Sequence, residues 1–125
     1  MTLRMRPVLL TAFALGFVTW LSAAADVTGK WISSFDTQIG EQHYTFEFKA
    51  TGSQLTGTAS SDNGKSEIKN GKVDGDTVTF VETLTFQGMT LEISYTGKIV
   101  SADQIDFTRQ VADVATEKLV ARRSK

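Results

Sequence analysis

The chain has 125 residues, with 13 basic and 14 acidic side chains, a formal charge of -1, one proline and no cysteine. This length corresponds to one domain at most, and the 41% of hydrophobic residues excludes a fully disordered chain. The lack of cysteine excludes disulfide scaffolds, thiol nucleophiles and zinc–thiolate sites, and the near-neutral charge argues against a nucleic-acid-binding protein.

Residues 1–25 have the three-part layout of a secretory signal peptide. Arg4 and Arg6 give a positive start, an uncharged apolar run follows, and small residues precede Asp26. The apolar run is short for a membrane-spanning helix, which needs about 20 residues, and an uncleaved anchor is the alternative. We therefore expect a secreted protein, periplasmic or extracellular, with no membrane span after cleavage and a single domain over residues 26–125.

Beyond this segment, apolar and polar side chains alternate, which is typical of half-buried β-strands. Tyr44, Phe46 and Phe48, for example, alternate with polar residues and therefore share one face of a strand. For the end of the chain, a short amphipathic helix is an alternative to a strand, because the Thr-Glu-Lys sequence at 116–118 is compatible with helical conformation. The pattern predicts about eight strands, near residues 28–36, 42–50, 54–61, 65–73, 76–86, 89–99, 103–111 and 116–123.

Short turns rich in glycine, asparagine and aspartate separate the expected strands and favour hairpins between neighbours. An up-and-down meander leaves two open edges, which closure into a barrel removes. We therefore predict an all-β fold, an antiparallel up-and-down barrel. Its outward residues are polar, the reverse of an outer-membrane barrel, so we expect it in water. The aromatic residues of the domain share the inward parity: Trp31, Phe35, Tyr44, Phe46, Phe48, Phe80, Phe86, Tyr95 and Phe107.

Two charged residues interrupt the inward face. Glu82 lies between Phe80 and Leu84, and Arg109 lies in the same way between apolar neighbours of a later strand. Burying either charge alone is unfavourable, so each requires a partner or access to water. The two simplest solutions are that Glu82 and Arg109 meet, or that Arg109 lies over the ring of Trp31 in a cation–π contact.

These motifs together resemble the lipocalin and calycin pattern, in particular small secreted bacterial lipocalin-like domains. In that pattern a Gly-x-Trp motif on the first strand, here Gly29-Lys30-Trp31, packs under a basic residue from the end of the barrel, and the resemblance points to Arg109. It implies a lipocalin-like barrel with no established activity, although some relatives carry hydrolase-like labels. The other matching segments are Thr28, Phe35-Asp36-Thr37, Tyr44-Thr45-Phe46, Leu55-Thr56-Gly57-Thr58, the hairpins starting at Gly71-Lys72-Val73 and Gly97-Lys98-Ile99, and Ala121-Arg122-Arg123.

The sequence offers little catalytic chemistry. His43 is the only histidine and has outward parity, with no serine or aspartate placed for a relay. Asp74 and Asp76 flank a glycine in a turn, which is too few oxygens for calcium. Glu82 is a candidate for one acid of a glycosidase pair, but no second inward carboxylate is evident. We expect no catalytic residue, no metal and no cofactor.

The function we predict is non-enzymatic binding of a small apolar or amphiphilic molecule in or at the mouth of the barrel. The walls would be Trp31, Tyr44, Phe80, Tyr95 and Phe107, with Glu82 and Arg109 as polar anchors. The alternatives are a carbohydrate-processing hydrolase or its accessory, and a packed structural or interaction domain without ligand. An internal void above roughly 300 Å³ would favour the ligand-binding alternative. The oligomeric state is not predicted.

Overall fold

The computed structural model describes residues 26–124, so the expected signal peptide at 1–25 lies outside the described residues. Within that part of the chain there is no helix that could cross a membrane. The strands are β1 (Gly29–Thr37), β2 (Gly40–Thr51), β3 (Gln54–Ser61), β4 (Gly64–Glu67), β5 (Lys69–Asp74), β6 (Thr77–Phe86), β7 (Met89–Ser101), β8 (Gln104–Val111) and β9 (Ala115–Arg123).

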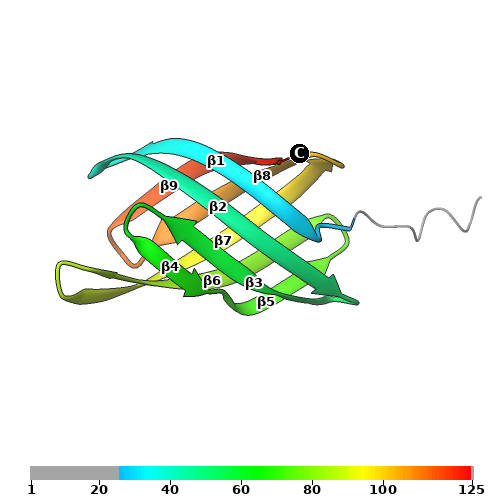
Figure 1. The fold of residues 1–125 in the computed structure, drawn as a ribbon, viewed down its shortest axis with the longest axis horizontal. Coiled ribbons are helices and arrows are strands. Elements are labelled where there is room, and N and C mark those ends of the chain that lie inside the picture. The colour runs from blue at the N-terminus through cyan, green and yellow to red at the C-terminus, as the bar shows by residue number, and fades with distance from the viewer. Residues whose placement is uncertain (1–25, 125) are drawn as a thin grey trace, which may run out of the picture.

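These strands form one closed antiparallel barrel (Figure 1). The sheet order is β2-β1-β9-β8-β7-β6-β5-β3-β4, and an additional pairing between β2 and β3 closes the sheet into a barrel. Short turns connect consecutive strands, as the glycine-rich segments predict. The all-β, up-and-down barrel is therefore confirmed, and the final segment is a strand and not a helix.

One expected strand, 65–73, is broken into β4 and β5, which together occupy a single position of the eight-position barrel. Ile68 lies at the break, where its side chain is buried and its N–H donates to the carbonyl of Gly57 at 3.0 Å. Asn70 has a φ of 55°, and the register of β5 against β6 shifts between Lys69 and Lys72. A bulge of this kind bends the strand locally, so that its later part, β5, also pairs with β6, and it adds curvature to the barrel.

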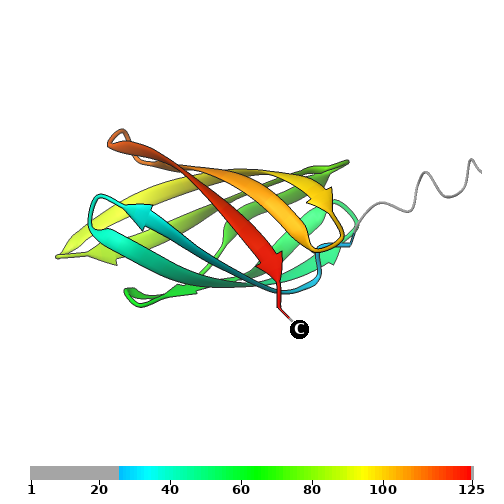
Figure 2. The ribbon, with the colours of Figure 1, turned by 90° about the horizontal axis from the view of Figure 1, so that it is seen from above.

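The two ends of the barrel differ. The turns after β1, β3, β6 and β8 lie together at one end, which we call the mouth. The turns after β2, β5 and β7 lie at the opposite end, which we call the packed end, and both Asp26 and Ser124 lie there (Figure 2).

The interior at mid-height is a cluster of aromatic rings in mutual contact. Phe80 and Tyr95, opposite each other on β6 and β7, stack with ring centroids 4.4 Å apart. Phe46 contacts both of these rings and also Phe107. Each ring excludes roughly 150–250 Å² from water, so this cluster supplies much of the burial that holds the barrel together. The inward parity of the aromatic residues is confirmed wherever the side chain is described.

Arg123 joins the start and the end of the domain at the packed end. Its guanidinium carbon lies 4.5 Å from the ring centroid of Trp31. Nη1 donates to the carbonyl of Thr28 at 2.8 Å, and Nη2 donates to the carbonyl of Asp26 at 2.9 Å. Arg109, which the resemblance placed over Trp31, lies elsewhere, so that part of the expectation was wrong. Sequence parity could not choose between the two arginines, because both face the interior on neighbouring strands.

Candidate functional site

The strand order brings Glu82 and Arg109 together. Glu82 lies on β6 and Arg109 on β8, and β7 runs between them with Tyr95 facing inward. Tyr95 is registered with Arg109 across the β7–β8 ladder. Because inward side chains of neighbouring strands meet on one face, the two charges converge on the tyrosine hydroxyl. Of the two solutions that the sequence left open, the meeting of Glu82 with Arg109 is therefore the one adopted.

The contacts form a connected network inside the barrel. Tyr95 donates its hydroxyl hydrogen to Oε1 of Glu82 at 2.8 Å, and Tyr44 donates to Oε2 at 2.9 Å. Arg109 Nη1 donates to the Tyr95 oxygen at 2.7 Å and lies 3.8 Å from Glu82 Oε1. Glu82 is 1% exposed, so its charge is compensated by these three neighbours in place of water.

Glu117 is a fifth ionisable member, which the sequence did not single out. It is the partner of Arg109 across the β8–β9 ladder, and its Oε1 lies 2.9 Å from Arg109 Nε. The alignment of that contact is poor for a hydrogen bond, so it acts as an ion pair. The signal was that Glu117 has the same parity as Leu119 and Ala121 in the segment predicted as a strand at 116–123.

Burial controls the protonation of the network. Burial raises the pKa of Glu82 above its ordinary value, although the hydrogen bond from Tyr95 and the charge of Arg109 lower it in part. Burial also raises the pKa of Tyr44 and raises that of Tyr95 well above the ordinary value, and the Glu82 charge adds to both shifts. For Arg109, burial lowers the pKa, but the neighbouring tyrosines and Glu82 outweigh burial and raise it. Arg109 is therefore a permanent cation.

Aromatic faces enclose this cation. The guanidinium carbon of Arg109 lies 5.0 Å from the ring centroid of Tyr44, 5.2 Å from that of Phe35 and 5.6 Å from that of Tyr95. Contacts of this type are worth about 0.5–2 kcal/mol each when they are shielded from water. The guanidinium is thus fixed in orientation, with part of it turned toward the mouth.

Above the network, a pocket of about 130 Å³ opens at the mouth. Arg109 and Glu117 form the charged part of its floor. On one side, Asn63 Nδ2 donates to Oε1 of the buried Gln42 at 3.0 Å and links the turn after β3 to β2. The apolar wall consists of Ile39, Leu84, Leu91, Val111 and Val114.

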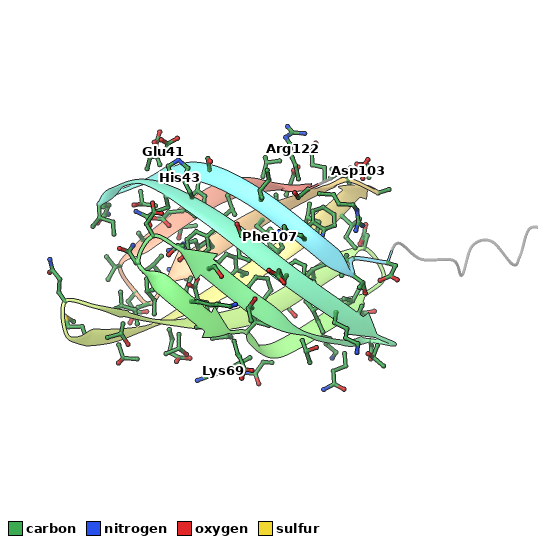
Figure 3. All side chains as sticks on the ribbon, viewed as in Figure 1. Glu41, His43, Lys69, Asp103, Phe107 and Arg122 are labelled. Atoms are coloured by element: carbon green, nitrogen blue, oxygen red, sulfur yellow. The ribbon has the colours of Figure 1, made fainter. Side chains whose placement is uncertain are left out.

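The other residues expected to form pocket walls have different positions. Phe80, Tyr95 and Phe107 pack against one another below the network, and Figure 3 shows Phe107 in the middle of the barrel. Trp31 lies at the packed end under Arg123. The apolar wall combines Leu84, Leu91 and Val111, which parity marks as inward but cannot distinguish from the packed interior, with Ile39 and Val114, which lie in turns.

His43 lies outside the barrel, as its parity predicts. It is exposed on β2, where Nε2 lies 3.6 Å from Glu41 and Nδ1 lies 3.6 Å from Asp62 (Figure 3). Inside the barrel, Glu117 is a second inward acid that the sequence analysis did not identify, but Arg109 lies within ion-pair distance of both it and Glu82. Two acids flanking a sugar bond need a free cleft between them, and here a guanidinium contacts both.

Comparison with known proteins concerns the fold alone. No family model matches the chain, and no curated protein matches it. A solved structure described as a redesigned beta barrel, mFAP1, bound to DFHBI, is similar, with a TM-score of 0.52 and 13% sequence identity. The likeness covers 78% of this chain and 94% of that chain. This likeness to a solved structure supports an antiparallel barrel consistent with a lipocalin-like fold.

Proposed function

We propose that the protein is a secreted, non-enzymatic, lipocalin-like binding protein that takes a small amphiphilic molecule into the mouth pocket, with its polar group on the charged floor and its apolar part against the aliphatic wall. The observation that carries the proposal is an aliphatic wall standing over a polar floor, in which Arg109 and Glu117 are available to orient a polar group. Binding pockets combine apolar walls with a few placed polar groups in this way.

The pocket size limits the guest. At about 130 Å³ it does not reach the roughly 300 Å³ named above as favouring ligand binding, so the pocket fits only a guest smaller than a drug-sized molecule. An apolar cavity of about 150 Å³ is known to hold benzene, so the buried part of the guest is a ring or a chain of about six carbons. Six methylene groups at about 0.8 kcal/mol each give a Kd of roughly 0.3 mM.

A series of straight-chain alcohols tests this proposal. The methyl resonances of Leu91 and Val111 are followed by NMR while each alcohol is added. The Kd is expected to fall about fourfold per added carbon and then level off near six carbons. Val111→Trp fills the pocket and is expected to abolish binding, whereas Val100→Trp, an exposed position at the packed end, is expected to leave it unchanged. A complete lack of saturable binding would favour a packed interaction domain.

We further propose that the protein belongs with small secreted bacterial lipocalin-like domains and that residues 1–25 are removed on export. A Trp31 covered by a basic residue supports the family, with Arg123 in the role. Cleavage before Asp26 retains both carbonyls that Arg123 contacts. The intact mass of the protein from its native compartment is expected to correspond to a chain starting at Asp26, and a full-length mass would contradict cleavage and favour the uncleaved anchor.

A further inference from the structure

We propose that the protein binds an extended peptide segment of alternating apolar and acidic residues along the seam between β1 and β9, as an added strand on the free edge of β9. This site lies on the side wall of the barrel and is separate from the mouth pocket. Strand addition of this type uses main-chain hydrogen bonds for affinity and alternate side-chain positions for specificity.

The seam exists because the closing ladder is short. Within residues 26–124, β1 and β9 are registered at Trp31 with Arg123 and at Ile32 with Arg122, after which no further pairs follow toward the mouth. Both strands continue, and each is fully paired on its other side. Two strand edges with unused hydrogen-bonding groups therefore face each other along the side of the barrel.

The direction of the free groups follows from the pairing. Ser124 N–H donates to the carbonyl of Lys30 across the seam at 2.8 Å, and Ile32 is registered with Arg122. Backbone groups of alternate residues point to the same side of a strand. On β9, the N–H and C=O of Val120 and Lys118 consequently face the seam, so an added strand has a ladder to join.

Two open hollows mark the place where such a strand would lie. One, of about 450 Å³, is lined by residues of β1, β8 and β9, including Phe35, Phe107 and Leu119. The other, of about 370 Å³, continues from it along β1 and β9. Apolar side chains on the inward face of the added strand would contact the two rings and Leu119.

A buried polar group without a partner points to a missing ligand at the same place. Ser33 lines the second hollow and is 7% exposed, yet its hydroxyl has no hydrogen-bond partner among residues 26–124. Leaving a buried hydroxyl unpaired costs about one to three kcal/mol. A peptide backbone in the seam would offer the donor or acceptor that this hydroxyl lacks.

Charge selects the outward residues of the peptide. Lys118 and Arg122 are exposed on β9, on either side of Val120, and each lines one of the hollows. Asp106 lines the first hollow as well, so the two hollows together present two cations and one carboxylate. Opposite charges across a strand pair are favourable, so an acidic residue beside Lys118 fits the seam and a basic residue does not.

The test uses a fluorescently labelled, end-capped peptide of alternating valine and glutamate, with binding to the wild-type protein followed by anisotropy. A Kd below about 1 mM is expected. Two control peptides carry lysine in place of glutamate, or N-methyl groups that remove the main-chain donors on one edge. Both controls are expected to bind at least about tenfold more weakly.

Protein variants and hydrogen exchange locate the site. Lys118→Glu is expected to weaken peptide binding about five- to tenfold, while Lys69→Glu, an exposed position on the opposite side of the barrel from Arg122, leaves binding unchanged (Figure 3). The peptide is expected to slow exchange of the Lys118 and Val120 amides. Equal binding of the N-methylated peptide, no effect of Lys118→Glu, no saturation at 1 mM, or a dimer that already protects those amides would each overturn the proposal.

Discussion

Replacing Arg109 by methionine removes the cation on which the buried network depends. The side chain is 5% exposed, and its loss deletes the charge-assisted hydrogen bond to Tyr95, worth about 1.5–3 kcal/mol. It also leaves Glu82 and Glu117, whose side chains are 1% and 11% exposed, without a counter-charge. Breaking a buried pair from one side costs about 3–5 kcal/mol. We therefore expect about 4 kcal/mol lower stability at pH 7, which lowers Tm by roughly 16–32 °C.

The pH dependence of this loss identifies its cause. The folded-state pKa of Glu82 is already raised above 4.5, and Arg109 is one of the groups that restrain it. Arg109→Met raises that pKa further, so the folded variant keeps a proton that its unfolded chain has released. The stability linked to this proton is fully present below about pH 4.5 and is lost as pH rises through the folded pKa. The deficit of the variant should therefore shrink on acidification from pH 7.

Urea unfolding followed by far-ultraviolet circular dichroism between pH 4.5 and pH 7 measures the effect. Arg122→Met, at an exposed position, serves as the matched control and should change stability by less than about 0.5 kcal/mol. Adding Glu82→Gln to Arg109→Met should recover part of the loss, because it removes one of the uncompensated carboxylates. A deficit that is small, independent of pH, or unaffected by Glu82→Gln would refute an electrostatic role for Arg109.

Two further outcomes are expected. Tyr44 and Tyr95 should form phenolate at higher pH in the folded protein than in the urea-unfolded chain, because burial raises both pKa values. Stability should therefore fall as pH rises above about 10. Ultraviolet titrations that coincide for the folded and the unfolded protein would contradict this. Arg123→Met should lower stability by about 2 kcal/mol, because it loses the contacts with the Trp31 ring and with two backbone carbonyls. Urea unfolding measures this loss, with Arg122→Met as the control. Equal effects of the two variants would count against a specific role of the Arg123 contacts.

The strand pattern made the barrel predictable from the sequence and placed Glu82 and Arg109 on its inward face, with their meeting as one of two possible solutions. A strand has a strict period of two, so one face fixes the orientation of every residue on it. Short turns and the need to remove open edges then leave few arrangements of the strands. Parity could not show that Tyr95 stands between the two charges, because that depends on the register across β7.

The features that could not be predicted from the sequence depend on contacts between distant parts of the chain. The choice of Arg123 over Arg109 for Trp31 is decided where β9 meets β1. The break at Ile68 reflects pairing with Gly57 on β3, which leaves no trace in the alternation. Whether the rings fill or line the barrel depends on volume, and alternation carries no information about volume.

The contacts of Arg123 with the start of the domain also have a consequence for the order of folding. Its contacts with Thr28 and Asp26 span 95 and 97 positions of the chain. Bringing such remote segments together has the largest entropic cost of loop closure among the contacts described in the domain. Neighbouring hairpins can pair while the polypeptide is still being made, but the ring of strands shuts only after nearly all of it has emerged. The joint between the first and last strands is thus expected to form late and slowly during folding.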